Sequence, residues 1–138
     1  AFDVRDGAGI KLLEAAGVET AILSGRESEA LRRRMEDLGI SLAVTGSGDK
    51  AAGLRELAAA RRLKPEEIGY VGDDLMDLPA MRLAGWSACP ADAVAEARAA
   101  AAHVTAANGG RGAVREVAEH LLKARGSWDA VLRDFGGS

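Results

Sequence analysis

Three aspartates follow a predicted strand closely and are the residues of this sequence best suited to chemistry. In the stretch IGYVGDDLMD, Asp73 and Asp74 end an apolar run, and Asp77 comes one helical turn later. Two carboxylates about 4 Å apart repel each other by roughly 4 kcal/mol at an effective dielectric constant of 20. A hard cation such as Mg²⁺ removes that repulsion by binding carboxylate and phosphate oxygens. The alternative is that Asp74 or Asp77 only caps the next helix, but a cap needs one acid; the stretch therefore favours a metal site.

Two other segments place groups that suit an anion at predicted strand ends. Ser24, Gly25 and Arg26 precede a helix, and helix N-termini attract anions. Lys50 opens a helix after the turn TGSGDK, where a cation is unfavourable unless an anion lies nearby. Each has a plainer alternative: a simple helix start with Ser28 as the cap, and a solvated lysine. The turn lacks the spacing of a P-loop.

A glycine-rich turn, NGGRGAVRE at residues 108–116, opens another predicted helix and carries Arg111 at its start. Arg111 could bind an anionic group of a substrate, and a turn with a surface arginine is the equal alternative. At the other end of the chain, AFDVRDGAGI predicts a helix with Asp6 as a candidate cap and Gly9 allowing close approach of a neighbouring backbone.

Short apolar strands alternate with amphipathic helices along the whole chain, which is typical of a doubly wound, Rossmann-like parallel sheet in one α/β domain. Ligands of such sheets bind beyond the carboxyl ends of the strands. The predicted strands are residues 19–24, 40–46, 68–74, 86–90 and 103–106. The predicted helices are residues 27–39, 49–62, 76–85, 91–101 and 110–126.

Composition excludes several classes of function. The 138 residues carry a formal charge of −3 with both signs interspersed, so nucleic acid is not expected as a partner. No apolar run reaches the ~18 residues of a membrane helix, and no membrane partner is expected. The single cysteine, Cys89, fits a reducing compartment and hence a cytoplasmic location. Cys89, His103 and His120 are too scattered in sequence to suggest a zinc site.

The order of these motifs resembles the haloacid dehalogenase (HAD) superfamily: Ser24 after one strand, Lys50 at a helix start, then Asp73 and Asp74 after a later strand. Within it, the chain is most similar to the small phosphatases without a cap domain that act on acidic keto-sugar phosphates of the 3-deoxy-D-manno-octulosonate 8-phosphate type. The stretches that carry the likeness are VRDGAGIKLL, AILSGR, GSGDK, YVGDDLMDLPAM and NGGRGAVREV. The resemblance implies Mg²⁺-dependent phosphate monoester hydrolysis in lipopolysaccharide biosynthesis, through an aspartyl-phosphate intermediate.

The resemblance also implies roles for individual residues. The metal ligands are Asp73 and Asp74, supported by Asp77 and Asp6, and the catalytic pair is Lys50 and Ser24. The residues that face phosphate and substrate are Ser24, Gly25, Arg26, Lys50, Arg5 and Arg111. It further implies a homotetramer with a core of residues 1–126 and a tail of residues 127–138 that contacts a neighbouring subunit.

One departure from the family is serious: Asp-x-Asp, which carries the nucleophile and the general acid, occurs nowhere in these residues. In the family this motif lies upstream on the first, central strand, so Asp3 and Asp6 do not replace it. We therefore expect the first central strand to be missing and this chain, alone, to be inactive.

Three alternatives stay open at this point. The chain could be a catalytically incomplete HAD-like domain that acts in assembly or regulation. It could be a phosphoacceptor signalling domain, although such domains place their acidic pair first and their lysine last. If it is a phosphatase, its substrate could instead be a sialic-acid or ketodeoxynonulosonate 9-phosphate.

Overall fold

The computed structural model describes residues 4–24, 28–40, 42–44 and 48–136. Its strands are β1 (Ala21–Leu23), β2 (Leu42–Val44), β3 (Gly69–Val71), β4 (Trp86–Cys89) and β5 (His103–Val104). Its helices are α1 (Val4–Ala15), α2 (Glu29–Leu38), α3 (Lys50–Ala60), α4 (Leu78–Leu83), α5 (Ala95–Ala100), α6 (Ala113–Ala124) and α7 (Trp128–Gly136), with 3₁₀ turns η1 (Pro65–Glu67) and η2 (Leu75–Asp77). Each predicted strand and helix is present, usually shorter than its sequence pattern.

The strands form two parallel sheets. In one, β1 pairs with β2, with Ile22 opposite Ala43. In the other, β4 lies between β3 and β5, with Tyr70 opposite Ser87 and Cys89 opposite Val104. Within the described part of the chain, no ladder of hydrogen bonds joins β1 to β3. The predicted α/β class with parallel strands is confirmed, and its strands are divided between two sheets.

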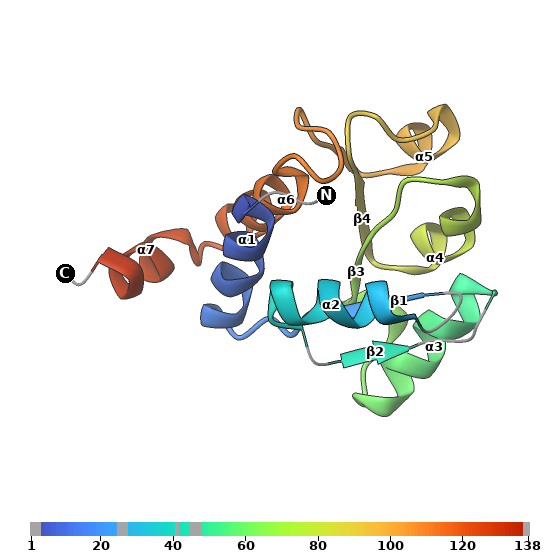
Figure 1. Cartoon of the computed structure of the whole chain (residues 1–138), viewed down its shortest axis with the longest axis horizontal. Coiled ribbons are helices and arrows are strands. Elements are labelled where there is room, and N and C mark those ends of the chain that lie inside the picture. Colours follow the sequence, from blue (N-terminus) through green and yellow to red (C-terminus); the bar gives the residue numbers. More distant parts are fainter. Residues whose placement is uncertain (1–3, 25–27, 41, 45–47, 137–138) are drawn as a thin grey trace.

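Helices cover both faces of the three-stranded sheet, as expected of a doubly wound fold. In Figure 1, α1 and α6 lie on one side of β3 and β4, and α4 and α5 lie on the other. The core on the α4 side comprises Leu54, Tyr70, Ala80, Met81, Cys89, Ala93 and Ala97. Burying a large aliphatic side chain contributes roughly 1.5–3 kcal/mol, so this layer holds the sheet on which the acidic residues stand.

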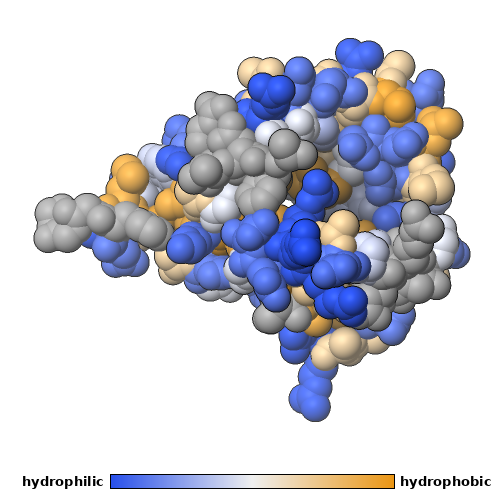
Figure 2. Space-filling model, in the orientation of Figure 1, coloured by the Kyte–Doolittle hydropathy of each residue, from blue (hydrophilic) through white to orange (hydrophobic). Residues whose placement is uncertain are grey.

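A second core joins the two ends of the chain. It comprises Leu12, Leu13, Ala118, Leu122 and Val131, from α1, α6 and α7. Val131 is only 2% exposed, so the predicted tail begins with a helix that packs on the rest of the molecule. The face of the molecule shown in Figure 2 is mainly hydrophilic, with its apolar residues in separate patches.

The start of α1 confirms one local prediction and corrects another. A Cβ atom on Gly9 would lie 2.8 Å from the Cα atom of Arg115, so a glycine is needed for α1 to approach α6 this closely. The helix begins at Val4, which places Asp6 inside it; the prediction that Asp6 caps this helix was wrong. Ser28 does cap α2, since its Oγ accepts a hydrogen bond from the Leu31 amide at 3.1 Å. None of the described helices has the length and apolarity needed to cross a bilayer.

Candidate functional site

The acidic loop after β3 is organised by the carboxylate of Asp77. One of its oxygens, Oδ2, accepts hydrogen bonds from the backbone amides of Asp73 at 3.0 Å and Asp74 at 3.2 Å. Its other oxygen, Oδ1, accepts a hydrogen bond from the hydroxyl of Tyr70 at 2.6 Å. Tyr70 is a buried residue of β3, so the sheet fixes Asp77, and Asp77 fixes the backbone that carries the other two acids.

Asp74 and Asp77 also cap the short helical turn η2. Asp74 Oδ1 accepts a hydrogen bond from the Leu75 amide at 2.6 Å, and the two aspartates form a capping box. Both aspartates therefore have the capping role that the sequence offered as the alternative to metal binding, although one acid alone would be enough for a cap. Asp73 is left as the acid of the loop that has no capping role.

The charges of this loop shift the pKa values of its carboxyl groups in opposite directions. Burial raises the pKa of Asp73, and the neighbouring carboxyl groups of Asp77 and Asp74 raise it further. Burial also acts to raise the pKa of Asp77, but hydrogen bonds from Tyr70 and two amides, with the positive charge of Lys50, hold that pKa below its usual range. Asp73 is therefore the carboxylate whose negative charge is least compensated, and a cation beside it would be stabilised.

Gly72 is required for this geometry. A Cβ atom at this position would lie 2.5 Å from the Cβ atom of Asp77 and 3.0 Å from Cε1 of Tyr70. Any side chain here would displace the Asp77 carboxylate from its hydrogen bonds. The glycine of the Gly-Asp-Asp sequence thus serves the acids that follow it.

Lys50 connects the acidic loop to the other sheet. It is the first residue of α3, after the N-cap Asp49, whose carboxylate accepts a hydrogen bond from the Ala52 amide at 3.1 Å. The Lys50 ammonium donates a hydrogen bond to the carbonyl of Leu23, the last residue of β1, at 3.2 Å. The same charge helps lower the pKa of Asp77. The predicted helix-opening lysine therefore stands between the carboxyl ends of β1 and β3.

The other predicted site residues are placed less completely. Ser24 follows β1 directly, is half-buried, and its amide donates a hydrogen bond to the carbonyl of Val44 at 3.0 Å. Arg111 is exposed in the loop between β5 and α6. Gly25 and Arg26 lie outside the described residues, and Arg5 and Asp6 are described only in their backbone.

The donor set at this edge suits Mg²⁺. No group of three histidine, cysteine, aspartate or glutamate side chains that could hold a metal occurs among the described residues. Mg²⁺ is usually held by one or two carboxylates, with water and substrate phosphate supplying the other oxygens. Asp73, with its raised pKa, and the second oxygen of Asp74 fit that smaller requirement.

Sequence reasoning missed two features. From the sequence, Tyr70 could not be distinguished from any other core aromatic. Its hydrogen bond to Asp77 forms only because the turn between them folds back on the strand, and the sequence does not reveal that turn. His103 and His120 are distant in sequence, and nothing in the sequence predicts a contact between them, yet their rings stack with centroids 4.1 Å apart and Trp86 stacks beside them. They come from β5 and α6, and only the packing of that helix on the sheet brings them together.

Removing the Tyr70 hydroxyl should weaken the acidic loop in a pH-dependent way. Because the pKa of Asp77 is lowered in the fold, this group contributes stability above its unfolded pKa of 3.8, and the contribution is lost as pH falls through the folded value. We expect Tyr70→Phe to cost about 1 kcal/mol at neutral pH. It should also reduce the rise of stability between acid and neutral pH, measured by urea unfolding across that range. Thr105→Val, which removes another buried hydroxyl, should lower stability without changing its pH dependence.

Comparison with known proteins agrees with this geometry. A model of the haloacid dehalogenase-like hydrolases matches residues 3–85. The 3-deoxy-D-manno-octulosonate 8-phosphate phosphatase of Haemophilus influenzae is 43% identical over 125 residues, which cover 91% of this chain and 69% of that protein. The corresponding phosphatase of Yersinia pestis is 42% identical over 91% of this chain and 67% of its own length.

Solved structures give the same result. The crystal structure of the Moraxella catarrhalis phosphatase, in complex with a magnesium ion, a phosphate ion and a KDO molecule, has a TM-score of 0.90 and 39% identity, covering 98% of this chain and 78% of that one. The cobalt-bound H. influenzae phosphatase has a TM-score of 0.86 and 42% identity, covering 93% of this chain and 75% of that one. With its acidic loop, its helix-opening lysine and these relatives, the chain belongs to the haloacid dehalogenase-like hydrolases.

Proposed function

We propose that this chain carries the metal-binding and phosphate-binding part of a phosphatase that hydrolyses 3-deoxy-D-manno-octulosonate 8-phosphate. The observation that carries the proposal is the position of Lys50, whose ammonium bonds to the last carbonyl of β1 and also acts on the carboxylate of Asp77 after β3. A phosphoryl group at this edge would meet a cation from one sheet and metal-binding acids from the other. Relatives of 41–43% identity with that named activity support the choice of substrate.

Asp73 and Asp74 would hold Mg²⁺ at this edge. When bound, the ion would neutralise phosphate oxygens and stabilise the charge that develops during phosphoryl transfer. Asp77 would keep the loop in place through its hydrogen bonds to the two amides. Since the three acids are held as a group, metal affinity would depend on Asp77 and Tyr70 as well as on the ligands.

The remaining residues would bind the substrate. Lys50 would offset the charge of the phosphate, and Ser24 with the Gly25 amide would hold its oxygens. Arg26, Arg111 and Arg5 would face the sugar and its carboxylate, because guanidinium groups bind carboxylates with two parallel hydrogen bonds. Asp6, inside α1, would support this side of the site.

The nucleophile is the component that these residues do not supply, since they contain no Asp-x-Asp sequence. The division of the strands into two parallel sheets supports our proposal that a further strand, bearing that pair, lies between β1 and β3 in the active enzyme. A nucleophile there would be adjacent to Lys50 and to Asp73. We therefore expect the 138 residues alone to bind ligands without turning them over.

The identity of the sugar can be tested by binding. In the presence of Mg²⁺, 3-deoxy-D-manno-octulosonate 8-phosphate should bind the chain at least about tenfold more tightly than a sialic-acid 9-phosphate, measured by isothermal titration calorimetry. Equal affinities would leave the phosphatase class intact and refute the choice of substrate. If neither ligand bound while the chain still bound a partner protein, a role in assembly or regulation would be favoured instead.

The assembly and location of the protein belong to the same proposal. We propose a cytoplasmic homotetramer in which the tail, residues 127–138, contacts a neighbouring subunit beyond the 1–126 core. Val131 of α7 is buried against α1 and α6, whereas Leu132 is 46% exposed and is available for such a contact. Light scattering should show a tetramer that Leu132→Glu weakens, and an unchanged mass for that variant would refute the contact.

A further inference from the structure

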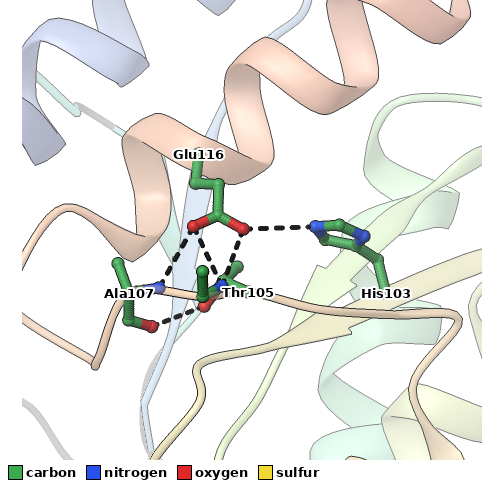
Figure 3. A network of polar contacts seen from close by, with 5 residues as sticks. His103, Thr105, Ala107 and Glu116 are labelled. Atoms are coloured by element: carbon green, nitrogen blue, oxygen red, sulfur yellow. Dashed lines mark hydrogen bonds and ion pairs between the residues drawn. The ribbon is translucent and has the colours of Figure 1, made fainter.

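The loop between β5 and α6 is held from one side by Glu116 (Figure 3). The carboxylate of Glu116 accepts hydrogen bonds from the amide of Ala106, at 3.0 Å to Oε1 and 2.9 Å to Oε2, and from the amide of Ala107 at 3.1 Å. Its Oε2 also lies 3.5 Å from Nε2 of His103. Glu116 is in the first turn of α6, so these bonds attach the end of β5 to the start of the helix.

The same loop is held from the other side by the segment after β4. Asp92 Oδ1 accepts a hydrogen bond from the Gly109 amide at 2.9 Å. The Ala91 amide donates a hydrogen bond to the carbonyl of Ala107 at 3.1 Å. A Cβ atom on Gly109 would lie 3.5 Å from Asp92 Oδ1 and 3.5 Å from Cγ of Pro90, which is ordinary van der Waals contact, so the two segments pack together here without requiring a glycine.

This second segment also touches the acidic loop. The amide of Val94 donates a hydrogen bond to the carbonyl of Asp73 at 3.0 Å. A short chain of hydrogen bonds therefore runs from Asp73, through residues 91–94, to the loop that carries Arg111. The three loops stand at the carboxyl ends of β3, β4 and β5, which are neighbours in one sheet.

Aromatic packing fixes the position of His103, which the Glu116 carboxylate contacts in addition to the loop amides. The rings of His103, His120 and Trp86 form a triangular cluster: His103 and His120 are 4.1 Å apart, and Trp86 is 5.8 Å from His120 and 6.4 Å from His103, with interplanar angles of 15–19°. Its Nε2 is buried with no hydrogen bond in the described structure, so Glu116 is its polar neighbour. This stacking packs α6 against β5 beside the point where the Glu116 carboxylate accepts hydrogen bonds from the loop amides.

We infer that Glu116 and Asp92 are positioning residues that hold the 105–112 loop, and with it Arg111, at the metal-binding edge so that the guanidinium meets the carboxylate of the sugar. The inference rests on the proposed function and adds to it, because both acids would act through the loop and Arg111 and not on the substrate directly. Both carboxylates accept hydrogen bonds from backbone amides of the loop, so they act on the position of its backbone.

Sugar binding in the presence of Mg²⁺ tests this role. With KDO as the probe, Glu116→Ala should raise the Kd about tenfold and Asp92→Ala about threefold, as expected when a charge-assisted contact is misaligned. The Kd for inorganic phosphate, which does not need Arg111, should stay within about twofold of wild type. Glu119→Gln is the matched control: Glu119 lies in the same helix, pairs with Arg115 at 2.8 Å, and should leave both constants unchanged.

Amide hydrogen exchange gives a second readout that needs no ligand. The amides of Ala106 and Ala107 should exchange at least about tenfold faster in Glu116→Gln, and that of Gly109 faster in Asp92→Asn, as local opening becomes easier. If wild type binds KDO and the variants bind it equally, the positioning role is overturned and the proposed function stands. If wild type binds phosphate but not KDO, or binds neither, the positioning role fails together with the proposed substrate.

Discussion

Replacing Asp73 with asparagine should weaken Mg²⁺ binding by at least about 100-fold while making the metal-free chain more stable, because one change removes a charged ligand and also a repulsion. Burial and the neighbouring carboxyl groups raise the pKa of Asp73, so its charged form costs stability in the fold. Asparagine keeps the shape without the charge. Calorimetric titration with Mg²⁺ measures the first effect, and thermal unfolding in a chelator measures the second.

The expected gain in stability is small because Asp73 is only partly buried, so water still reaches its carboxylate and screens its charge. A rise in Tm of about 1–2 °C would correspond to roughly 0.5 kcal/mol for a chain of this length. The sign follows from the raised pKa: lowering the pH through the folded pKa of Asp73 relieves the same repulsion, so the advantage of the variant should shrink in acid. Asp37→Asn, in the exposed part of α2, should change neither measurement. Undiminished Mg²⁺ binding by Asp73→Asn would remove Asp73 from the metal site.

Replacing Lys50 with alanine should have a comparably large effect on phosphate. Its positive charge helps lower the pKa of Asp77 in the acidic loop, and its ammonium bonds to the last carbonyl of β1, so Lys50 lies between the carboxyl ends of β1 and β3. We expect the Kd for inorganic phosphate in the presence of Mg²⁺ to rise about 100-fold, since an oxyanion would lose its cationic partner beside three carboxylates. Calorimetry or phosphorus NMR would measure the change.

The same variant should alter the acidic loop. Without Lys50, the pKa of Asp77 should move up toward its usual value, and the stability that its ionised form contributes should decrease at neutral pH. Lys11→Ala is a suitable control, because Lys11 is an exposed lysine at a helical position away from the site. If Lys50→Ala bound phosphate as wild type does, the phosphate would have to bind elsewhere.

The sequence was sufficient to predict the strands and the helices, and the family resemblance assigned Lys50 and the acidic loop to one site. Each strand of the structure lies inside a short apolar run, and parallel strands bring their carboxyl ends to one edge. The two features that decided the site, a lysine opening a helix and adjacent acids ending a strand, are local and unfavourable unless they meet a partner. An unfavourable local placement of charge of this kind can be recognised from a single sequence.

Contacts between distant segments could not be predicted in that way. The sequence predicts Asp77 as a supporting acid only, whereas its role depends on the hydrogen bond that it accepts from the buried Tyr70. Glu116 was an ordinary surface position of an amphipathic helix until the structure placed it against the amides that follow β5. The sequence predicts that α1 begins at Asp6, whereas it begins at Val4, because most of a helix's stability comes from tertiary packing, such as that of Gly9 against α6, and local residue preferences define its ends poorly.

Phosphate release from 3-deoxy-D-manno-octulosonate 8-phosphate tests the central claim most directly. The 138-residue chain should release none with Mg²⁺, and the same chain fused behind a strand that bears an Asp-x-Asp pair should release phosphate. A fusion with the first aspartate of that pair changed to asparagine serves as the control and should be inactive. Release by the chain alone, or no release by a folded fusion that binds Mg²⁺ and the substrate, would contradict the account.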